Sequence, residues 1–484
     1  MNYEAYEPVI GLEIHLQLAT QSKAFCGDDA SFGGEPNTHV SAISLGHPGT
    51  LPRLNKRQVE YAVRLGLALG SSINLRNCFD RKNYFYTDLP KGYQITQDRL
   101  PVCVGGSLEL EMDGYCRTVR LHHIHMEEDA GKSIHDLSPR HSMIDLNRAG
   151  VPLLEIVTEP DLRSGEEVDA FMTAMRQLAR YLGISDGNMQ EGSMRCDVNV
   201  SVRKKGDTGF GERCEIKNMN SMRFARQAIE FEVKRQIDLL ESGGQVQRAS
   251  LSFNPTTGAT SPMRDKESAH DYRYFPDPDL PPVVLTQTWV DEVLAQLPTL
   301  PKAYFERFVK EFGLSEYDAS LLTQERETAV FFEKTAKVCA SQNVSGKSVA
   351  NLFINKISPW LAEASMDIDA FPVSAEQLAA YLLLIEEGKV SASIANQRLF
   401  PELVKSSEMP PLELAQQLNL LQSSDSDFLE KIVDEVLAAN PDKVAEYRKG
   451  KKGLIGFFMG EVMKKSQGKA EPKATNVLVV RKLG

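Results

Sequence analysis

The chain has 484 residues, of which 25% are charged and 42% hydrophobic, as in an ordinary soluble globular protein with two or three domains. The formal net charge of −11 excludes a protein that coats nucleic acid along its whole length, but it leaves room for a local basic region. The longest apolar run covers residues 378–385, far fewer than the roughly 20 residues of a membrane-spanning helix, so no membrane segment is expected.

The first predicted element is a strand. The residues before it carry neither the basic nor the apolar segment of a signal peptide. In "VIGLEIHLQL", residues 9–18, apolar residues alternate with Glu13, His15 and Gln17. This period of two is typical of a strand with one buried face and one polar face.

The stretch "HHIHMEEDAGK", residues 122–132, predicts a second, less regular strand. If it is extended from residue 119, one face carries alternate residues, namely Val119, Leu121, His123, His125 and Glu127. Glu128 then points to the opposite face. A bulge before Asp129 would bring both glutamates to the same side.

A third strand, "SMRCDVNVSVR" at residues 193–203, places Arg195, Asp197 and Asn199 opposite its apolar face. A solvated sheet face usually carries a loose mixture of Lys, Thr, Ser and Gln. These faces instead carry Glu, His, Asp, Asn and Arg, which bind ions and stabilise charge. We therefore expect a sheet whose polar face is a catalytic floor; the alternative is an ordinary solvated face.

Carboxylates outnumber the histidines that would share this floor, which favours Mg²⁺ over Zn²⁺ and leaves Mn²⁺ open. Two phosphate-loop lookalikes, "DAGKS" and "VSGKS", lack the required first glycine, because Met126 and Ser341 stand there. Neither GxSxG nor HExxH occurs. Seven scattered cysteines without a CxxC pair indicate reduced thiols in a cytoplasmic protein.

Helices are predicted at residues 165–182 and from Ser221 to about residue 241, within the strand-rich first part of the chain. The proline-rich residues 275–285 indicate an extended segment, and helical periodicity dominates beyond residue 288. The predicted fold class is α+β. We expect a mainly antiparallel β domain with helices over residues 1–290, an all-α middle domain over 291–407 and a small helical tail domain over 408–484.

The last 44 residues are locally basic. From Pro441 onward, eleven Lys or Arg stand against four Asp or Glu, a balance of +7 in a chain with net charge −11. Such a patch attracts phosphate backbones without reading sequence, so it favours RNA; the alternative is a solvated charged tail.

Long motifs, in a fixed order, resemble the B subunit family of the tRNA-dependent amidotransferases. The strand motifs above belong to this set. The others are "DLPKGYQITQ" (88–97), "DLNRAGVPLLEIVTEPD" (145–161), "YRYFPDPDLPP" (272–282) and, in the tail, "GLIGFFMGEVMKKSQGKAEP" (453–472). The match runs through the first 290 residues and the tail, whereas the middle region matches more loosely.

The resemblance implies that glutamate or aspartate mischarged on tRNA(Gln) or tRNA(Asn) is converted to the amide. ATP would phosphorylate the side-chain carboxylate, and ammonia would displace the phosphate. The family draws the ammonia through a channel from an amidase A subunit, and a small C subunit completes the complex. It also implies a cradle-like first domain. One alternative is a non-catalytic tRNA-binding or assembly subunit; the other, a metallohydrolase, has no recognised motif. Which tRNA is the substrate stays open.

The resemblance assigns one metal site, and the chemistry and charge of other side chains add further candidates. It assigns the Mg²⁺ site to Glu13, His15, Glu127 and Glu128. The catalytic candidates are Glu128, Asp197 and Glu155; Asp197, Asn199 and Glu155 are also candidates for a second shell or a second metal. ATP or substrate would bind Lys91, Arg148, Arg195 and Asn199. Tyr272 and Arg273 either build the pocket or serve packing. The tRNA candidates are Lys449, Lys451, Lys452, Lys464 and Lys465. The expected structural histidines are His122, His123, His125 and His135.

The sequence departs from the family at one loop. Many members carry four cysteines there, which resemble a zinc knot. Here Cys26 remains, and the other three places hold Asp28, Ser41 and Ser44. One thiolate cannot make such a site, so no structural zinc is predicted, and packing alone is expected to hold the loop.

Overall fold

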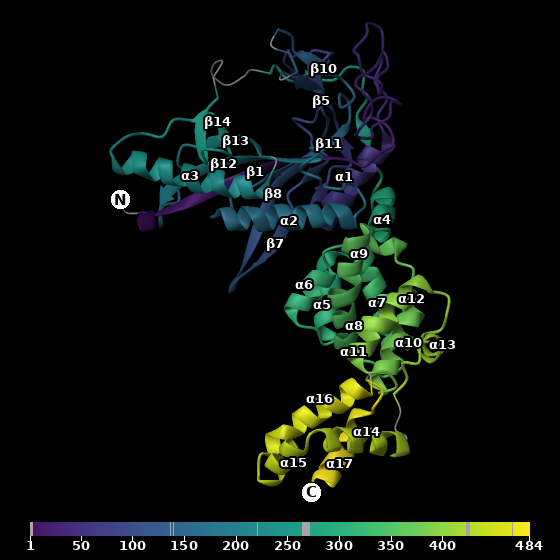
Figure 1. Cartoon of the computed structure of the whole chain (residues 1–484). Coiled ribbons are helices and arrows are strands. Elements are labelled where there is room, and N and C mark those ends of the chain that lie inside the picture. The colour runs from purple at the N-terminus through teal and green to yellow at the C-terminus, as the bar shows by residue number, and fades with distance from the viewer. Residues whose placement is uncertain are drawn as a thin grey trace. The chain divides into compact units, whose positions relative to one another are not determined.

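The computed structural model describes residues 3–135, 137–138, 140–219, 221–263, 272–422, 426–466 and 468–484. The chain divides into two compact units, Met1–Leu300 and Pro301–Gly484 (Figure 1). The first is built on a sheet with helices and the second is helical, so the fold is α+β. The expected boundary at residue 290 falls inside helix α4 (Gln287–Ala295), whose Val290 and Val293 join the core of the first unit.

A ten-stranded sheet organises the first unit. Its order is β15-β14-β13-β12-β1-β11-β8-β6-β2, with β7 paired to β8. These strands are β1 (Tyr6–Gln17), β2 (Ser72–Ile73), β6 (Cys103–Val104), β7 (Ser107–Met112), β8 (Tyr115–Glu128), β11 (Pro152–Thr158), β12 (Met194–Lys204), β13 (Cys214–Met219), β14 (Ala249–Asn254) and β15 (Ala259–Pro262). Among the described pairs β13 and β14 run parallel and the others antiparallel.

Short strands complete the first unit. They are β3 (Arg76–Asn77), β4 (Asp80–Asn83), β5 (Tyr93–Thr96), β9 (Lys132–Ile134), β10 (Met143–Asp145), β16 (Phe275–Pro276) and β17 (Val283–Val284). β4 lies between β5 and β16, which joins two segments nearly 200 residues apart. This small sheet matters for the site, because β5 also reaches the end of β8.

Helices bury the apolar face of the sheet. α2 (Gly165–Tyr181) and α3 (Met222–Glu241) run beside it, and α1 (Lys56–Ala68) packs near β8 (Figure 1). Ser164 caps α2 by accepting a hydrogen bond from the Glu167 amide, as its position before an acidic first turn predicts. Ile10, Leu12, Ile14 and Leu16 of β1 are at most 1% exposed, so the predicted alternation of this strand is confirmed.

The predicted single face from Val119 to Glu127 is wrong. The register of β8 against β11 shifts between Leu121 and His123. After this irregularity Ile124 and Met126 are fully buried among the core residues that include Val119 and Leu121. His125 and Glu127 are therefore on the polar face, but Val119 and Leu121 are not.

The second unit is helical throughout its described residues. Its longer helices are α5 (Pro301–Lys310), α6 (Glu316–Leu322), α7 (Arg326–Ala340), α8 (Gly346–Leu352), α9 (Ser358–Ala364), α10 (Ala375–Glu386), α12 (Phe400–Lys405), α13 (Pro411–Gln417), α14 (Ser426–Ala439), α15 (Pro441–Arg448), α16 (Ile455–Lys465) and α17 (Pro472–Leu483). Short pieces are η2 (Phe353–Ile357), η3 (Ile368–Ala370), α11 (Ala392–Ile394), η4 (Ala395–Leu399) and η5 (Lys452–Leu454).

The residues beyond 426 have a core of their own inside this unit. Val433 of α14, Phe458 and Val462 of α16 and Val479 of α17 are fully buried together. A further side chain, Tyr447 of α15, closes this core. In the described chain, none of the helices combines the length and the apolar character needed to cross a bilayer.

Candidate functional site

The floor is the polar face of the four neighbouring strands β12, β1, β11 and β8. One row of side chains crosses these strands in register: Arg195 pairs with His15, His15 with Glu155, and Glu155 with His125. Because paired residues of antiparallel strands point to the same side, four residues from four separate sequence segments meet here. The next row includes Glu13 opposite Asp197.

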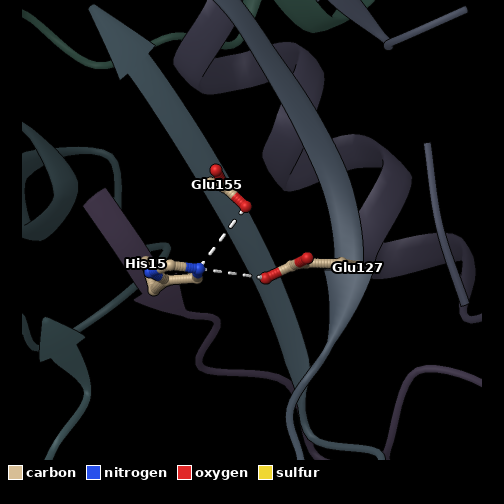
Figure 2. A group of neighbouring side chains, drawn as sticks. All are labelled: His15, Glu127 and Glu155. Atoms are coloured by element: carbon tan, nitrogen blue, oxygen red, sulfur yellow. Dashed lines mark ion pairs between the residues drawn. The ribbon is translucent and has the colours of Figure 1, made fainter. Parts of the chain in front are cut away.

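The first group of side chains with possible ligand atoms is named the His15 cluster. It consists of His15, Glu127, Glu155 and His125. Figure 2 shows His15 of β1, Glu155 of β11 and Glu127 of β8 pointing toward one another. His15 Nε2 lies 3.4 Å from Glu155 Oε2 and 3.5 Å from Glu127 Oε1. His125 Nε2 lies 3.4 Å from the same Glu155 oxygen and 3.6 Å from Glu127 Oε2. Two imidazoles thus alternate with two carboxylates.

These imidazoles are cationic at neutral pH. Burial lowers the pKa of His15, but the hydrogen bond and charge of Glu155, followed by the charge of Glu127, outweigh it and raise the pKa to about 9. The same balance raises the pKa of His125 to about 10. Burial would raise the pKa of Glu155, but the two histidines hold it well below its ordinary value. The protons on the two imidazoles therefore balance the negative charges of the two carboxylates in this cluster.

The second group, here the Glu13 cluster, consists of Glu13, Asp197 and Glu215. Asn199 Nδ2 donates to Glu13 Oε1 at 3.0 Å. Lys217 Nζ lies 2.8 Å from Glu215 and 3.6 Å from Asp197. Burial, followed by the charge of Glu155, raises the pKa of Glu13. This is an all-oxygen site with one fixed positive charge beside it.

Both clusters fit a divalent cation. In each, three ligand atoms lie within 4.8 Å of one another. Two buried oxygens, Glu127 Oε1 and Asn199 Oδ1, accept no hydrogen bond from the described residues, as expected where a cation would take the place of a donor. The oxygens of the Glu13 cluster suit Mg²⁺; the His15 cluster adds an imidazole, which must lose its proton to become a ligand.

The four residues expected at one Mg²⁺ site are not brought together. Glu13 lies in one cluster, and His15 and Glu127 lie in the other. Glu128 points elsewhere: its carboxylate contacts Lys91 and accepts the Ile95 amide at 3.0 Å. Alternation along β8 points the two neighbouring glutamates to opposite sides. Strand β5 contacts both of them: the Ile95 amide donates to Glu128, and Thr96 Oγ1 lies 3.4 Å from Glu127 Oε2.

Arg148 and Arg195, two of the expected anion-binding residues, converge on Asp129. Arg195 Nη2 donates to Asp129 Oδ2 at 2.7 Å, and Arg148 Nε lies 3.6 Å away. Gln17 Nε2 donates to the same oxygen at 2.7 Å. Burial would raise the pKa of Asp129, but the two guanidinium groups and Gln17 keep it below its ordinary value. Arg195 Nε is buried without an acceptor among the described residues.

Two residues of these clusters are not among the site residues that the sequence predicts. His125, expected to be structural, contacts both carboxylates of the His15 cluster. Glu215 belongs to β13, where in "CEIKNM" the polar Glu215 and Lys217 alternate with the buried Cys214 and Ile216. That alternation is the signal that would extend the floor to a further polar strand.

The remaining predicted residues lie outside the two clusters. Tyr272 and Arg273 run beside Asn83, whose Nδ2 donates to both of their carbonyl oxygens. His122 and His135 are exposed and His123 is half-buried. The basic candidates Lys449, Lys451, Lys452, Lys464 and Lys465 are all exposed around α15 and α16.

The loop with Cys26 is not held by packing alone, which corrects that expectation. Ser44 Oγ donates to Asp28 Oδ2 at 2.5 Å and accepts the Ser41 amide at 2.9 Å. Burial, above all, raises the pKa of Cys26 to about 11, so its thiol stays protonated. Hydrogen bonds thus link three of the four positions where many family members have cysteines.

Known families match both parts of the chain. Residues 8–291 match the GatB/GatE catalytic domain, and residues 330–483 match the GatB domain. The B subunit of the aspartyl/glutamyl-tRNA(Asn/Gln) amidotransferase from Geobacter sulfurreducens is 49% identical over 100% of both chains. The protein of the same name from Bradyrhizobium diazoefficiens is 50% identical over 99% of this chain and 97% of its own. The chain therefore belongs to the family of aspartyl/glutamyl-tRNA amidotransferase B subunits.

Proposed function

We propose that the chain is the subunit of a tRNA-dependent amidotransferase that activates and amidates the amino acid on a mischarged tRNA. The substrates are Glu-tRNA(Gln), Asp-tRNA(Asn) or both, with ATP and Mg²⁺. The subunit works in a cytoplasmic complex with an amidase A subunit, which supplies ammonia through a channel, and a small C subunit. The relatives' names support the tRNA substrate. The His15 and Glu13 clusters, two neighbouring groups of possible metal ligands on the floor, support the ATP chemistry.

The chemistry follows from the substrate. A carboxylate resists ammonia because it is anionic and its oxide leaves poorly. In the first step a carboxylate oxygen bonds to the γ-phosphorus of ATP and the bond to the bridging oxygen breaks, releasing ADP. In the second step ammonia bonds to the acyl carbon, phosphate leaves with the electron pair, and the amide nitrogen gives up its extra proton.

The chain's own residues would act by positioning and by charge. Arg195 and Arg148, held against Asp129, present positive charge at one side of the floor. The carboxylates of the His15 and Glu13 clusters would hold divalent ions, which neutralise phosphate charge during transfer. Lys91 and Glu128 compensate each other at the end of β8, so Glu128 is proposed to position Lys91 rather than to bind metal.

His15→Ala in the assembled complex tests this function. Ammonium chloride replaces the amidase as nitrogen source, so that only activation and amidation are measured. We expect ATP-dependent amide formation to be lost while the Kd for tRNA stays within about twofold, because phosphate and ribose contacts carry most RNA affinity. His135→Ala, the same change at an exposed residue, is the control. Undiminished amide formation in His15→Ala would reject the floor as the site of activation.

The basic tail is proposed to bind the tRNA backbone. Replacing Lys449, Lys451 and Lys452 by Gln should weaken tRNA binding and flatten its dependence on salt. Each lost phosphate contact reduces the steepness of the plot of log binding constant against log salt concentration by roughly 0.7 to 0.9. Filter binding at several salt concentrations measures both quantities. An unchanged slope would remove these lysines from the RNA interface.

A further inference from the structure

Lys82 lies on β4, next to the floor. In the pairing of β4 with β5 it stands opposite Gln94. Gln94 Nε2 donates to the Glu128 carbonyl at 2.8 Å, and Thr96, two residues on, contacts the Glu127 carboxylate. Two short hydrogen-bonded steps therefore connect the strand of Lys82 to the strand of the His15 cluster.

Four of the cations described above already have carboxylate partners. Lys91 contacts Glu128, Arg195 and Arg148 contact Asp129, and Lys217 contacts Asp197 and Glu215. Lys82 differs: the part of the chain that the structure describes places no carboxylate within ion-pair distance of its ammonium group.

Aromatic rings hold this ammonium group instead. Lys82 Nζ lies 4.9 Å from the ring centroid of Tyr272 and 6.0 Å from that of Tyr84. The two ring centroids are 6.0 Å apart, and the Asn83 amide ties their segments together by donating to the Tyr272 carbonyl at 3.0 Å. A ring quadrupole orients a cation without neutralising it, so the charge stays available to an anion.

The charge of Lys82 is also secure. Burial lowers its pKa, but the carboxylates of Glu127 and Glu155, together with Tyr274, outweigh burial and raise it. The field of the His15 cluster therefore reaches this lysine, and an anion that bridged the cluster's cation and Lys82 would meet positive charge on both sides.

We infer that Lys82 binds the terminal phosphate of ATP, as a fixed positive charge beside the carboxylates of the His15 cluster, which would hold a divalent ion. This inference rests on the proposed function and adds a residue to it. During transfer Lys82 would donate hydrogen bonds to non-bridging oxygens of the γ-phosphoryl group while the bond from phosphorus to the substrate carboxylate forms and the bond to ADP breaks. Lys82 keeps its proton throughout, because it stabilises charge and does not act as an acid.

Nucleotide binding to the assembled complex tests the assignment without requiring turnover. Lys82→Met keeps the length of the side chain but removes its charge, and Lys82→Arg keeps the charge. Kd values are measured with Mg²⁺ for ADP and for an ATP analogue with a non-hydrolysable β–γ bridge. Lys204→Met, at an exposed lysine at the end of β12, is the control.

We expect Lys82→Met to weaken binding of the analogue by roughly 10- to 100-fold, the loss of one charge-assisted hydrogen bond, with little effect on ADP. Lys82→Arg should recover most of that affinity. An equal loss for ADP and the analogue, or no loss in Lys82→Met, would overturn the assignment while leaving the proposed function intact. If the wild-type complex binds neither nucleotide in the presence of Mg²⁺, the proposed function and this inference both fail.

Discussion

The His15 cluster and the Glu13 cluster each take one residue from strand β1, two positions apart, yet the charges of their carboxylates are balanced by different means. In the Glu13 cluster a lysine, Lys217, contacts two of three carboxylates. In the His15 cluster two protonated imidazoles alternate with two carboxylates. A lysine stays in place when a cation arrives, whereas an imidazole can release its proton and become a ligand. The same sheet thus offers one site with a fixed counter-charge and one with a removable counter-charge.

The largest expected effect is at the His15 cluster. Glu127→Gln removes a carboxylate whose oxygens lie near both histidines, so amide formation by the complex should fall by roughly 100-fold or more at saturating ATP. Initial rates with ammonium chloride measure it. The matched control is Glu111→Gln at an exposed residue of β7. If Glu127→Gln kept the wild-type rate, the His15 cluster would have no part in the reaction.

An intermediate effect, with two opposite signs, is expected at the Glu13 cluster. Glu215→Gln removes a carboxylate of the Glu13 cluster and should raise the Mg²⁺ concentration for half-maximal rate by about 10- to 100-fold. Lys217→Met removes the competing charge and should lower that concentration. Magnesium titrations of both variants make the comparison. A shift in the same direction for both would show that the lysine supports the site rather than competing for it.

The smallest expected effect concerns stability and pH. The folded-state pKa of His15 is raised from 6.5 to about 9, so its protonation stabilises the metal-free chain fully below pH 6.5, and this contribution is lost as pH rises through about 9. His15→Gln should therefore lower the free energy of unfolding by on the order of 1 to 3 kcal/mol at pH 6 and by much less at pH 10. Urea unfolding with a chelator measures it.

Asn199→Ala, in the Glu13 cluster, is the control for that experiment, because an amide does not titrate. Its effect on stability should vary much less between these pH values. If the loss caused by His15→Gln were equally constant, the charge of the His15 cluster would not depend on protons, and the contrast between the two clusters would disappear.

The polar face of β1 could be predicted from the sequence, because Glu13, His15 and Gln17 alternate with residues that the core buries. Their partners could not. Which residue stands opposite His15 depends on the register of β11 and β12, and no local pattern specifies that Glu155 and Arg195 occupy those positions. Grouping Glu13 with His15 in one metal site followed from the family resemblance, whereas in the structure each side chain joins the partners in its own row.

The pair Glu127 and Glu128 illustrates the same limit. Alternation along β8 assigns them to opposite faces, and the irregularity of this strand lies at residues 121–123, where it does not bring the two glutamates to one side. A bulge depends on how two strands fit together, so the sequence of one strand does not locate it. Lys82 shows a related limit, because the tyrosine nearest to its ammonium group comes from a segment some 190 residues away.

The loop around Cys26 has a practical consequence for handling this protein. Hydrogen bonds already join Asp28, Ser41 and Ser44, and the thiol stays protonated. Strong chelators should thus leave the loop intact, and mild oxidants should find little thiolate there to attack. Samples with and without added divalent cations could then be compared with this loop unchanged in both.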